Sequence, residues 1–146
     1  MSVRAVRHTG IVVTDMERSL AFYRDELGLS VASDQLESGE FIDSILAMPG
    51  TSVRTVKLAA LEGPTLVELL EFHDGSPASM SAGDLRRVGA THAALTVDDL
   101  DALFERLRSR GTPFLSEPRV SADGRARVCF CTDPDGTPLE LVEPLG

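Results

Sequence analysis

The stretch HTGIVVTDM at residues 8–16 recurs as HAALTVDDL at residues 92–100, 84 residues further along the chain (92 − 8). Each copy begins with a histidine, continues as an apolar, strand-like run and ends in an acidic turn. A second pair, VELLE at residues 67–71 and LELVE at residues 139–143, follows in the same order with an offset of 72 (139 − 67). Two matches in the same order indicate an internal duplication, and this duplication determines the fold.

An amphipathic helix is expected directly after each histidine run. In the first copy a capping box from Thr14 to Glu17 predicts the start, and Gly28 provides the stop. In the second copy Asp98 is the expected N-cap and Gly111 ends the helix. One face of each helix carries the apolar residues, namely Met16, Leu20, Tyr23 and Leu27 in the first and Leu100, Leu103, Phe104 and Leu107 in the second.

A pair of strands is expected to complete each copy. Residues 52–60 and 65–72 flank the turn at 62–64, and residues 125–132 and 138–143 flank the DPDG turn at 133–136. Each copy is therefore a strand and a helix followed by two or three strands. The expected boundaries are a first module at 1–72, a linker at 73–89 and a second module at 90–146, all within one compact domain.

The stretch from residue 33 to residue 50 occurs only in the first copy. Its apolar residues show no strand alternation, and a short helix that stops at Pro49-Gly50 fits the pattern. Such an insertion is either a lid over a ligand or a packed connection.

Composition narrows the possible partners. A formal net charge of −9 argues against nucleic acids and anionic membrane surfaces, which attract Lys and Arg, so a small molecule is the expected partner. The N-terminal residues lack the features of a secretory signal, which predicts a cytoplasmic protein. Cys129 and Cys131, the only cysteines, are interpreted as reduced, partly buried thiols rather than as metal ligands.

Histidine and glutamate occupy equivalent positions in both copies: His8 with His92, and Glu68 with Glu140. A carboxylate on an otherwise apolar strand is costly unless its charge is compensated, and one metal ion compensates two such groups. Two imidazoles and two carboxylates suit Zn, Ni, Co, Mn or Fe(II), one divalent ion per chain. The alternative is that all four are ordinary residues at strand ends and exposed edges.

These motifs resemble the vicinal oxygen chelate superfamily, which includes glyoxalase I, methylmalonyl-CoA epimerase, extradiol dioxygenases and bleomycin-resistance proteins. The resemblance is carried by residues 8–15 with SLAFY at 19–23, by VEL at 67–69, by residues 92–99, and by DPDG leading into LEL at 139–141. It implies an α+β fold of two tandem βαβββ modules that form a cupped mixed sheet around the metal. It also implies that His8, Glu68, His92 and Glu140 are the metal ligands.

The resemblance further implies a substrate with two adjacent oxygens. The working hypothesis is a metal-dependent isomerase, epimerase or lyase of the glyoxalase type, in which Glu140 or Glu68 removes a proton next to a carbonyl and the metal stabilises the enediolate. Glu40 and Asp43 are weaker candidates for the base. Two alternatives stay open: an Fe(II)-dependent extradiol-type dioxygenase, although Cys131 replaces the tyrosine expected there, and a non-catalytic binding protein for a drug or metabolite.

Two further expectations concern assembly and substrate recognition. A homodimer is expected because closed twofold pairs are the commonest oligomers, with each site complete within one chain. Arg119, Arg125 and Arg127 either hold an anionic group or form a solvated basic edge.

Overall fold

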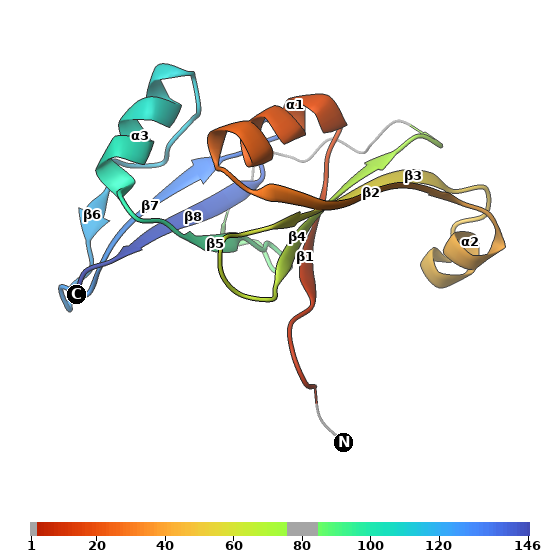
Figure 1. The fold of residues 1–146 in the computed structure, drawn as a ribbon, viewed down its shortest axis with the longest axis horizontal. Coiled ribbons are helices and arrows are strands. Elements are labelled where there is room, and N and C mark those ends of the chain that lie inside the picture. Colours follow the sequence, from red (N-terminus) through yellow and green to blue (C-terminus); the bar gives the residue numbers. More distant parts are fainter. Residues whose placement is uncertain (1–2, 76–84) are drawn as a thin grey trace. The chain divides into compact units, whose positions relative to one another are not determined.

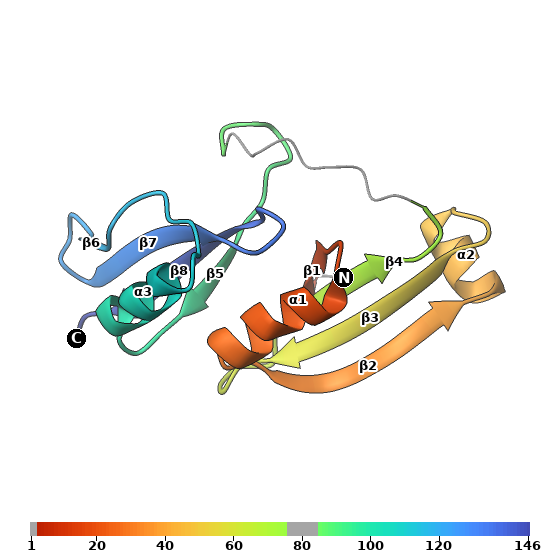
Figure 2. The same cartoon turned by 90° about the horizontal axis from the view of Figure 1, so that it is seen from above.

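The computed structural model describes residues 3–75 and 85–146, which form two compact units, Met1–Ser79 and Met80–Gly146 (Figures 1 and 2). Each unit is one four-stranded mixed sheet with a helix on one face, so the expected α+β fold is confirmed. The predicted linker at 73–89 includes residues 76–84, which lie outside the described part of the chain. Within that part, no helix is both long and apolar enough to cross a membrane.

The first unit follows the order strand, helix, three strands, with a short helix inserted before the third strand. Its elements are β1 (His8–Val12), α1 (Met16–Leu20), the π-helix η1 (Ala21–Glu26) that continues α1, β2 (Ser30–Ser38), α2 (Glu40–Leu46), β3 (Ser52–Ala59) and β4 (Leu66–Phe72). The sheet order is β1-β4-β3-β2, in which β1 runs parallel to β4 and the other neighbours are antiparallel.

The second unit repeats this arrangement, with three of its four strands shorter than their counterparts. Its elements are β5 (Ala93–Thr96), α3 (Leu100–Ser109), β6 (Arg119–Val120), β7 (Ala126–Thr132) and β8 (Pro138–Pro144). The sheet order β5-β8-β7-β6 matches that of the first unit, again with a parallel pair at one edge and antiparallel pairs elsewhere. The duplication in the sequence is therefore a duplication of the βαβββ module.

The core of each unit lies between its helix and its sheet. Alternate residues of a strand point to opposite faces, so Ile11 and Val13 are buried at 6% and 1% exposure whereas Val12 between them is 53% exposed. Tyr23, from the helical segment, is fully buried. Helix α1 therefore does not cover the face of the first sheet that carries Val12. Residues of β1 separated from Val12 by an even number of positions point to this same uncovered face.

Both predicted helix caps were wrong by one residue. Asp15 caps α1, because its Oδ1 accepts a hydrogen bond from the Arg18 amide at 3.0 Å, while Thr14 Oγ1 accepts from the Arg18 guanidinium instead. Asp99, not Asp98, caps α3 through the Ala102 amide at 3.0 Å. In both copies the cap is an aspartate carboxylate, which makes a charge-assisted hydrogen bond to the amide.

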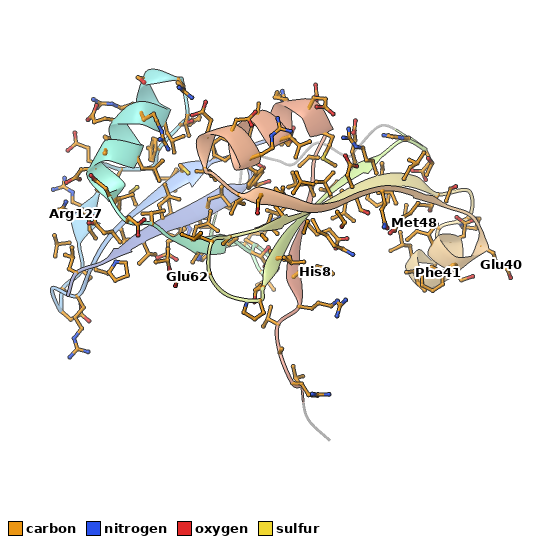
Figure 3. All side chains as sticks on the ribbon, viewed as in Figure 1. His8, Glu40, Phe41, Met48, Glu62 and Arg127 are labelled. Carbon is orange, nitrogen blue, oxygen red and sulfur yellow. The ribbon has the colours of Figure 1, made fainter. Side chains whose placement is uncertain are left out.

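The insertion at 33–50 contains a strand as well as the predicted helix. β2 is an edge strand with mostly exposed residues, so the apolar alternation that would reveal it is absent. The short helix is confirmed as α2: Ile42 packs inward at 6% exposure, and Asp43 accepts hydrogen bonds from the Gly50 and Thr51 amides at 2.9 and 2.8 Å. Ile42 and Asp43 anchor the segment in this way, whereas Phe41 and Met48 remain exposed on it (Figure 3).

Candidate metal centre

In the first unit, the pairing of β1 with β4 brings His8 and Glu68 together. Gly10 lies opposite Glu68 in the parallel register, and His8 is two residues before Gly10, on the same face of the sheet. His8 Nε2 lies 2.8 Å from Glu68 Oε2. This face is the one opposite α1, where His8 projects from the sheet (Figure 3).

The second unit builds the same pair in the same register. Ala94 lies opposite Glu140, and His92 precedes Ala94 by two residues, as His8 precedes Gly10. His92 Nε2 lies 3.2 Å from Glu140 Oε2. All four residues singled out in the sequence thus lie in two equivalent histidine–glutamate pairs, one in each unit.

The two pairs differ in burial. The Glu68 side chain is 11% exposed and that of Glu140 is 26% exposed, while the two histidine side chains have similar exposures of 37% and 41%. Glu68 is thus a nearly buried carboxylate, which is expensive without compensating charge. Glu140 is the more accessible of the two.

The pairs also differ in what lies opposite the glutamate on the next strand. Lys57 of β3 lies opposite Glu68, with its Nζ 3.9 Å from Glu68 Oε1. At the equivalent place in the second unit, Phe130 of β7 lies opposite Glu140 and packs edge-to-face on the His92 ring, at 5.1 Å between ring centres. Sequence reasoning missed both residues, because placing them opposite the glutamates requires the exact register of each hairpin.

The donor atoms fit a divalent cation chemically and in their spacing. Nitrogen and oxygen ligands about 2.1 Å from one ion, at angles between 90° and 109°, are roughly 3.0–3.4 Å apart. The two nitrogen–oxygen distances of 2.8 and 3.2 Å are close to that range. Within residues 3–75 and 85–146, histidine, cysteine and acidic side chains do not gather in groups of three or more that could hold an ion.

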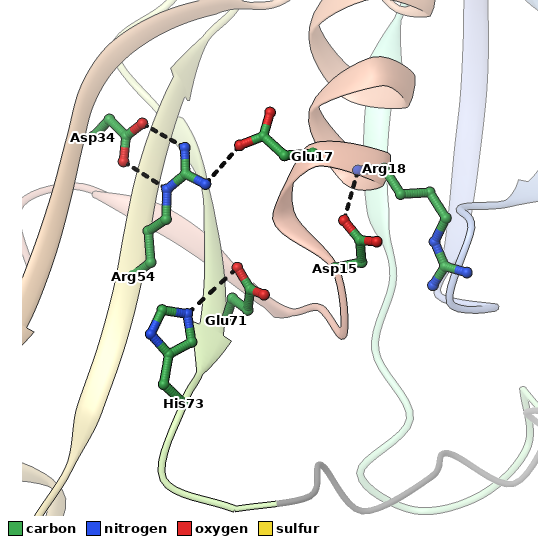
Figure 4. Close-up of polar contacts among 7 residues, drawn as sticks. All are labelled: Asp15, Glu17, Arg18, Asp34, Arg54, Glu71 and His73. Carbon is green, nitrogen blue, oxygen red and sulfur yellow. Dashed lines mark hydrogen bonds and ion pairs between the residues drawn. The ribbon is translucent and has the colours of Figure 1, made fainter.

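The other acidic candidates have different surroundings. Asp43 is occupied in capping the amides that follow α2, and Glu40 is exposed at the start of that helix. The third histidine, His73, lies just beyond β4 with its Nε2 3.6 Å from Glu71 Oε2 (Figure 4). None of these residues forms part of the equivalent pairs.

Of the basic and thiol groups considered from the sequence, Arg127 and the two cysteines lie away from the histidine–glutamate pairs, whereas Arg119 lies opposite Val128, on the face of the second sheet that carries Glu140. Arg127 makes an ion pair with Asp101 of α3, so it faces the helix and not the face that carries Glu140. Cys129 and Cys131 are free and buried, and burial raises the pKa of Cys129 to about 11 and that of Cys131 to about 12. Protonated, buried thiols are poor metal ligands, which agrees with their interpretation as core residues.

On the helix side of the first sheet, Arg54 ties three elements together (Figure 4). Its guanidinium donates to both carboxylate oxygens of Asp34 on β2, at 3.0 and 2.8 Å, and to Glu17 on α1 at 2.7 Å. The hydrogen bonds from Arg54 hold the pKa of Asp34 below its ordinary value. This network holds α1 and the edge strand to the middle of the sheet that carries the first pair.

Comparison with known proteins agrees with the duplicated fold. The chain is 32% identical over 145 residues to the uncharacterized protein YaeR of Escherichia coli, and the match covers 98% of each. It is 29% identical over 137 residues to a probable lactoylglutathione lyase of Synechocystis sp., covering 93% of this chain and 92% of that protein. The crystal structure of a glyoxalase family protein from Bacillus cereus has the same fold, with a TM-score of 0.90 and 21% identity over 100% of this chain and 97% of the other.

The family assignment follows from a match that covers nearly the whole chain. The model of the Glyoxalase/Bleomycin resistance protein/Dioxygenase superfamily matches residues 5–141, which include both histidine–glutamate pairs. The resemblance drawn from the sequence motifs is thereby confirmed, and the chain belongs to the Glyoxalase/Bleomycin resistance protein/Dioxygenase superfamily.

Proposed function

We propose that this protein is a divalent-metal-dependent isomerase, epimerase or lyase of the glyoxalase type. His8 and Glu68 of the first unit and His92 and Glu140 of the second would together hold one ion per chain, chosen from Zn, Ni, Co, Mn and Fe(II). The observation that carries the proposal is that one histidine–glutamate pair is built twice, at the same register of two equivalent strand pairs.

The chemistry follows from the residues that surround such an ion. When bound, a divalent cation polarises a substrate carbonyl and so makes the hydrogen on the neighbouring carbon more acidic. The substrate would be a small molecule with two adjacent oxygens, consistent with a chain whose net charge of −9 disfavours nucleic acids and anionic membranes. The chain then has to supply a base that takes the proton.

Glu140 is the better candidate for that base. Its side chain is more than twice as exposed as that of Glu68, and its neighbour across the strands is the uncharged Phe130. A carboxylate that is accessible and has no ammonium group beside it can loosen from the ion, approach a substrate carbon and accept its proton.

Glu68 is better suited to holding the ion. It is nearly buried, and both of its oxygens have neighbours, His8 at 2.8 Å and Lys57 at 3.9 Å. A side chain fixed in this way presents a constant ligand geometry, but it would have to break these contacts in order to move a proton.

The reaction type is tested by proton exchange. Protein reconstituted without oxygen with Ni, Co or Mn is incubated in heavy water with lactoylglutathione, suggested by the name of the Synechocystis relative, with other acyl thioesters and with small hydroxycarbonyl compounds. We expect at least one compound to exchange the hydrogen next to its carbonyl for deuterium, and the His92→Ala variant not to catalyse this. Ring or C–C cleavage that requires Fe(II) and oxygen, with no exchange, would establish the dioxygenase instead. Tight binding of a compound by folded, metal-free protein without exchange would establish a binding protein.

A further inference from the structure

Lys57 is the only lysine in the chain, whose other 13 basic residues, apart from histidine, are all arginine. Its position is also unusual, because it lies opposite Glu68, on the face of the first sheet that carries the candidate metal ligands. Arginine and lysine are not equivalent: lysine presents a compact point charge on a flexible stem, whereas arginine presents a planar fork. A chain that otherwise uses arginine throughout has a point charge at this one place.

The ammonium group has hydrogen-bonding capacity to spare. Nζ lies 3.9 Å from Glu68 Oε1, which is longer than a hydrogen bond, and no other polar contact of Lys57 is found among residues 3–75 and 85–146. An ammonium has three donors, and the Lys57 side chain is 32% exposed, so these donors can reach a group arriving from solvent.

The fold itself does not require a cation here. The equivalent position in the second unit is Phe130, and that unit forms the same sheet and the same histidine–glutamate pair. Around Lys57 the first unit has hydroxyl groups: Ser33 lies opposite it on β2, and Thr55 is two residues earlier on the same face of β3. The first unit therefore presents a polar, positively charged patch where the second presents an aromatic ring.

A count of charges indicates what this patch accepts. Two carboxylates and one divalent cation sum to zero, so Lys57 leaves the filled site with one net positive charge. The charge left over is that of Lys57 alone, so a group with a single negative charge at this place is favoured over a doubly charged phosphate.

We propose that Lys57 forms a subsite for a carboxylate of the substrate, next to the place where the two adjacent oxygens bind. The inference rests on the proposed function, because it defines the subsite relative to the metal ligands. It narrows the substrate to a small hydroxy- or oxo-compound that bears a carboxylate within reach of its chelating oxygens. Lys57 would bind and orient this carboxylate and take no part in proton transfer.

The test uses two probes that differ only in one carboxylate. Glycolate offers a hydroxyl and one carboxylate to a metal ion, and tartronate adds a second carboxylate. The dissociation constant of each is measured from the visible spectrum of the Co(II) protein, and the cobalt content is measured alongside. Variants are Lys57→Met, Lys57→Arg and, as a control, Arg24→Met, which removes a cation whose ion pair is with the neighbouring surface residue Asp25.

We expect Lys57→Met to weaken tartronate about tenfold, as for loss of one charge-assisted hydrogen bond, and glycolate less than threefold. Lys57→Arg should retain part of the tartronate affinity, Arg24→Met should change neither probe, and cobalt content should remain at the wild-type value throughout. Unchanged tartronate affinity in Lys57→Met would refute the subsite. Loss of cobalt in Lys57→Met with equal weakening of both probes would also refute it, and would show that Lys57 positions Glu68. Wild-type protein that takes up no ion would refute the proposed function itself, and the subsite with it.

Discussion

Replacing Glu140 by glutamine should abolish most of the activity while leaving the fold intact. Glutamine keeps the shape and one neutral oxygen but cannot accept the proton, and removal of a general base lowers rates by about 10²- to 10⁴-fold. At about 1.36 kcal/mol for each factor of ten, this corresponds to a barrier higher by roughly 2.7–5.4 kcal/mol. Because the Glu140 side chain is 26% exposed and its nearest polar neighbour is His92, we expect the free energy of unfolding to change by less than about 1 kcal/mol.

The matched variant is Glu68→Gln. This glutamate is proposed to hold the ion, so the substitution should lower metal affinity but leave turnover within about tenfold of wild type once metal is saturating. The assay is hydrogen–deuterium exchange at the carbon next to the carbonyl, followed by NMR at increasing metal concentration, with urea unfolding as the control for folding. Full activity of Glu140→Gln would refute the assignment of Glu140 as the base. A larger loss of activity in Glu68→Gln than in Glu140→Gln at saturating metal would refute the assignment of Glu68 as a ligand only.

Three further predictions concern stability, the thiols and assembly. Arg54→Met should lower the free energy of unfolding by about 1–2 kcal/mol in urea titrations, because the Arg54 side chain donates hydrogen bonds to two other elements. The control Arg24→Met should change the free energy of unfolding by less than about 0.5 kcal/mol. Equal effects of the two substitutions would contradict the bridging role of Arg54. Since Arg54 lowers the pKa of Asp34, this difference should be present above about pH 4 and shrink as the pH falls and Asp34 is protonated. Cys129 and Cys131 should resist iodoacetamide at pH 8 until the protein is unfolded, since burial raises their pKa values to about 11 and 12, and rapid labelling of native protein would count against this. The chain should sediment as a homodimer at micromolar concentration, and a monomer there would contradict the expected twofold assembly.

The duplicated parts of the fold were predicted well from the sequence because each of their elements occurs twice, so that the pattern in one copy supports the pattern in the other. The strands expected at 52–60, 65–72, 125–132 and 138–143 correspond to β3, β4, β7 and β8 to within one residue at each end. Each of these strands is buried on at least one face, so its apolar residues record its position. The helices after the histidine runs were visible for the same reason.

Elements without a buried face were harder to predict. β2 lies at the edge of its sheet with polar residues on both faces. The equivalent strand of the second unit, β6, has only two residues. Hydrogen bonds to β3 hold β2 in place, and these leave no periodic trace in the sequence. The cap positions were displaced for a related reason, since the geometry of one backbone turn decides which acidic residue reaches the amide.

The repeated motifs of the two copies predicted which histidine lies with which glutamate, but they did not predict how the two pairs differ. That His8 belongs with Glu68, and His92 with Glu140, could be expected from the repeated order of the motifs. The unequal burial of the two glutamates, and the cation beside only one of them, depend on which residue each neighbouring strand places opposite. That information comes from strand register, which the hairpin turns encode only indirectly.

The most direct test of the account is the metal stoichiometry of the wild-type protein and of two variants, one from each unit. Protein freed of metal, reconstituted with Co(II) or Zn and desalted, is analysed for bound ions per chain, with circular dichroism to confirm folding. We predict close to one ion per wild-type chain, and loss of most of it in His8→Ala and equally in His92→Ala, because one ion would need both pairs. Full metal content in either folded variant, or two ions per chain lost one at a time, would contradict a single site built from the two pairs.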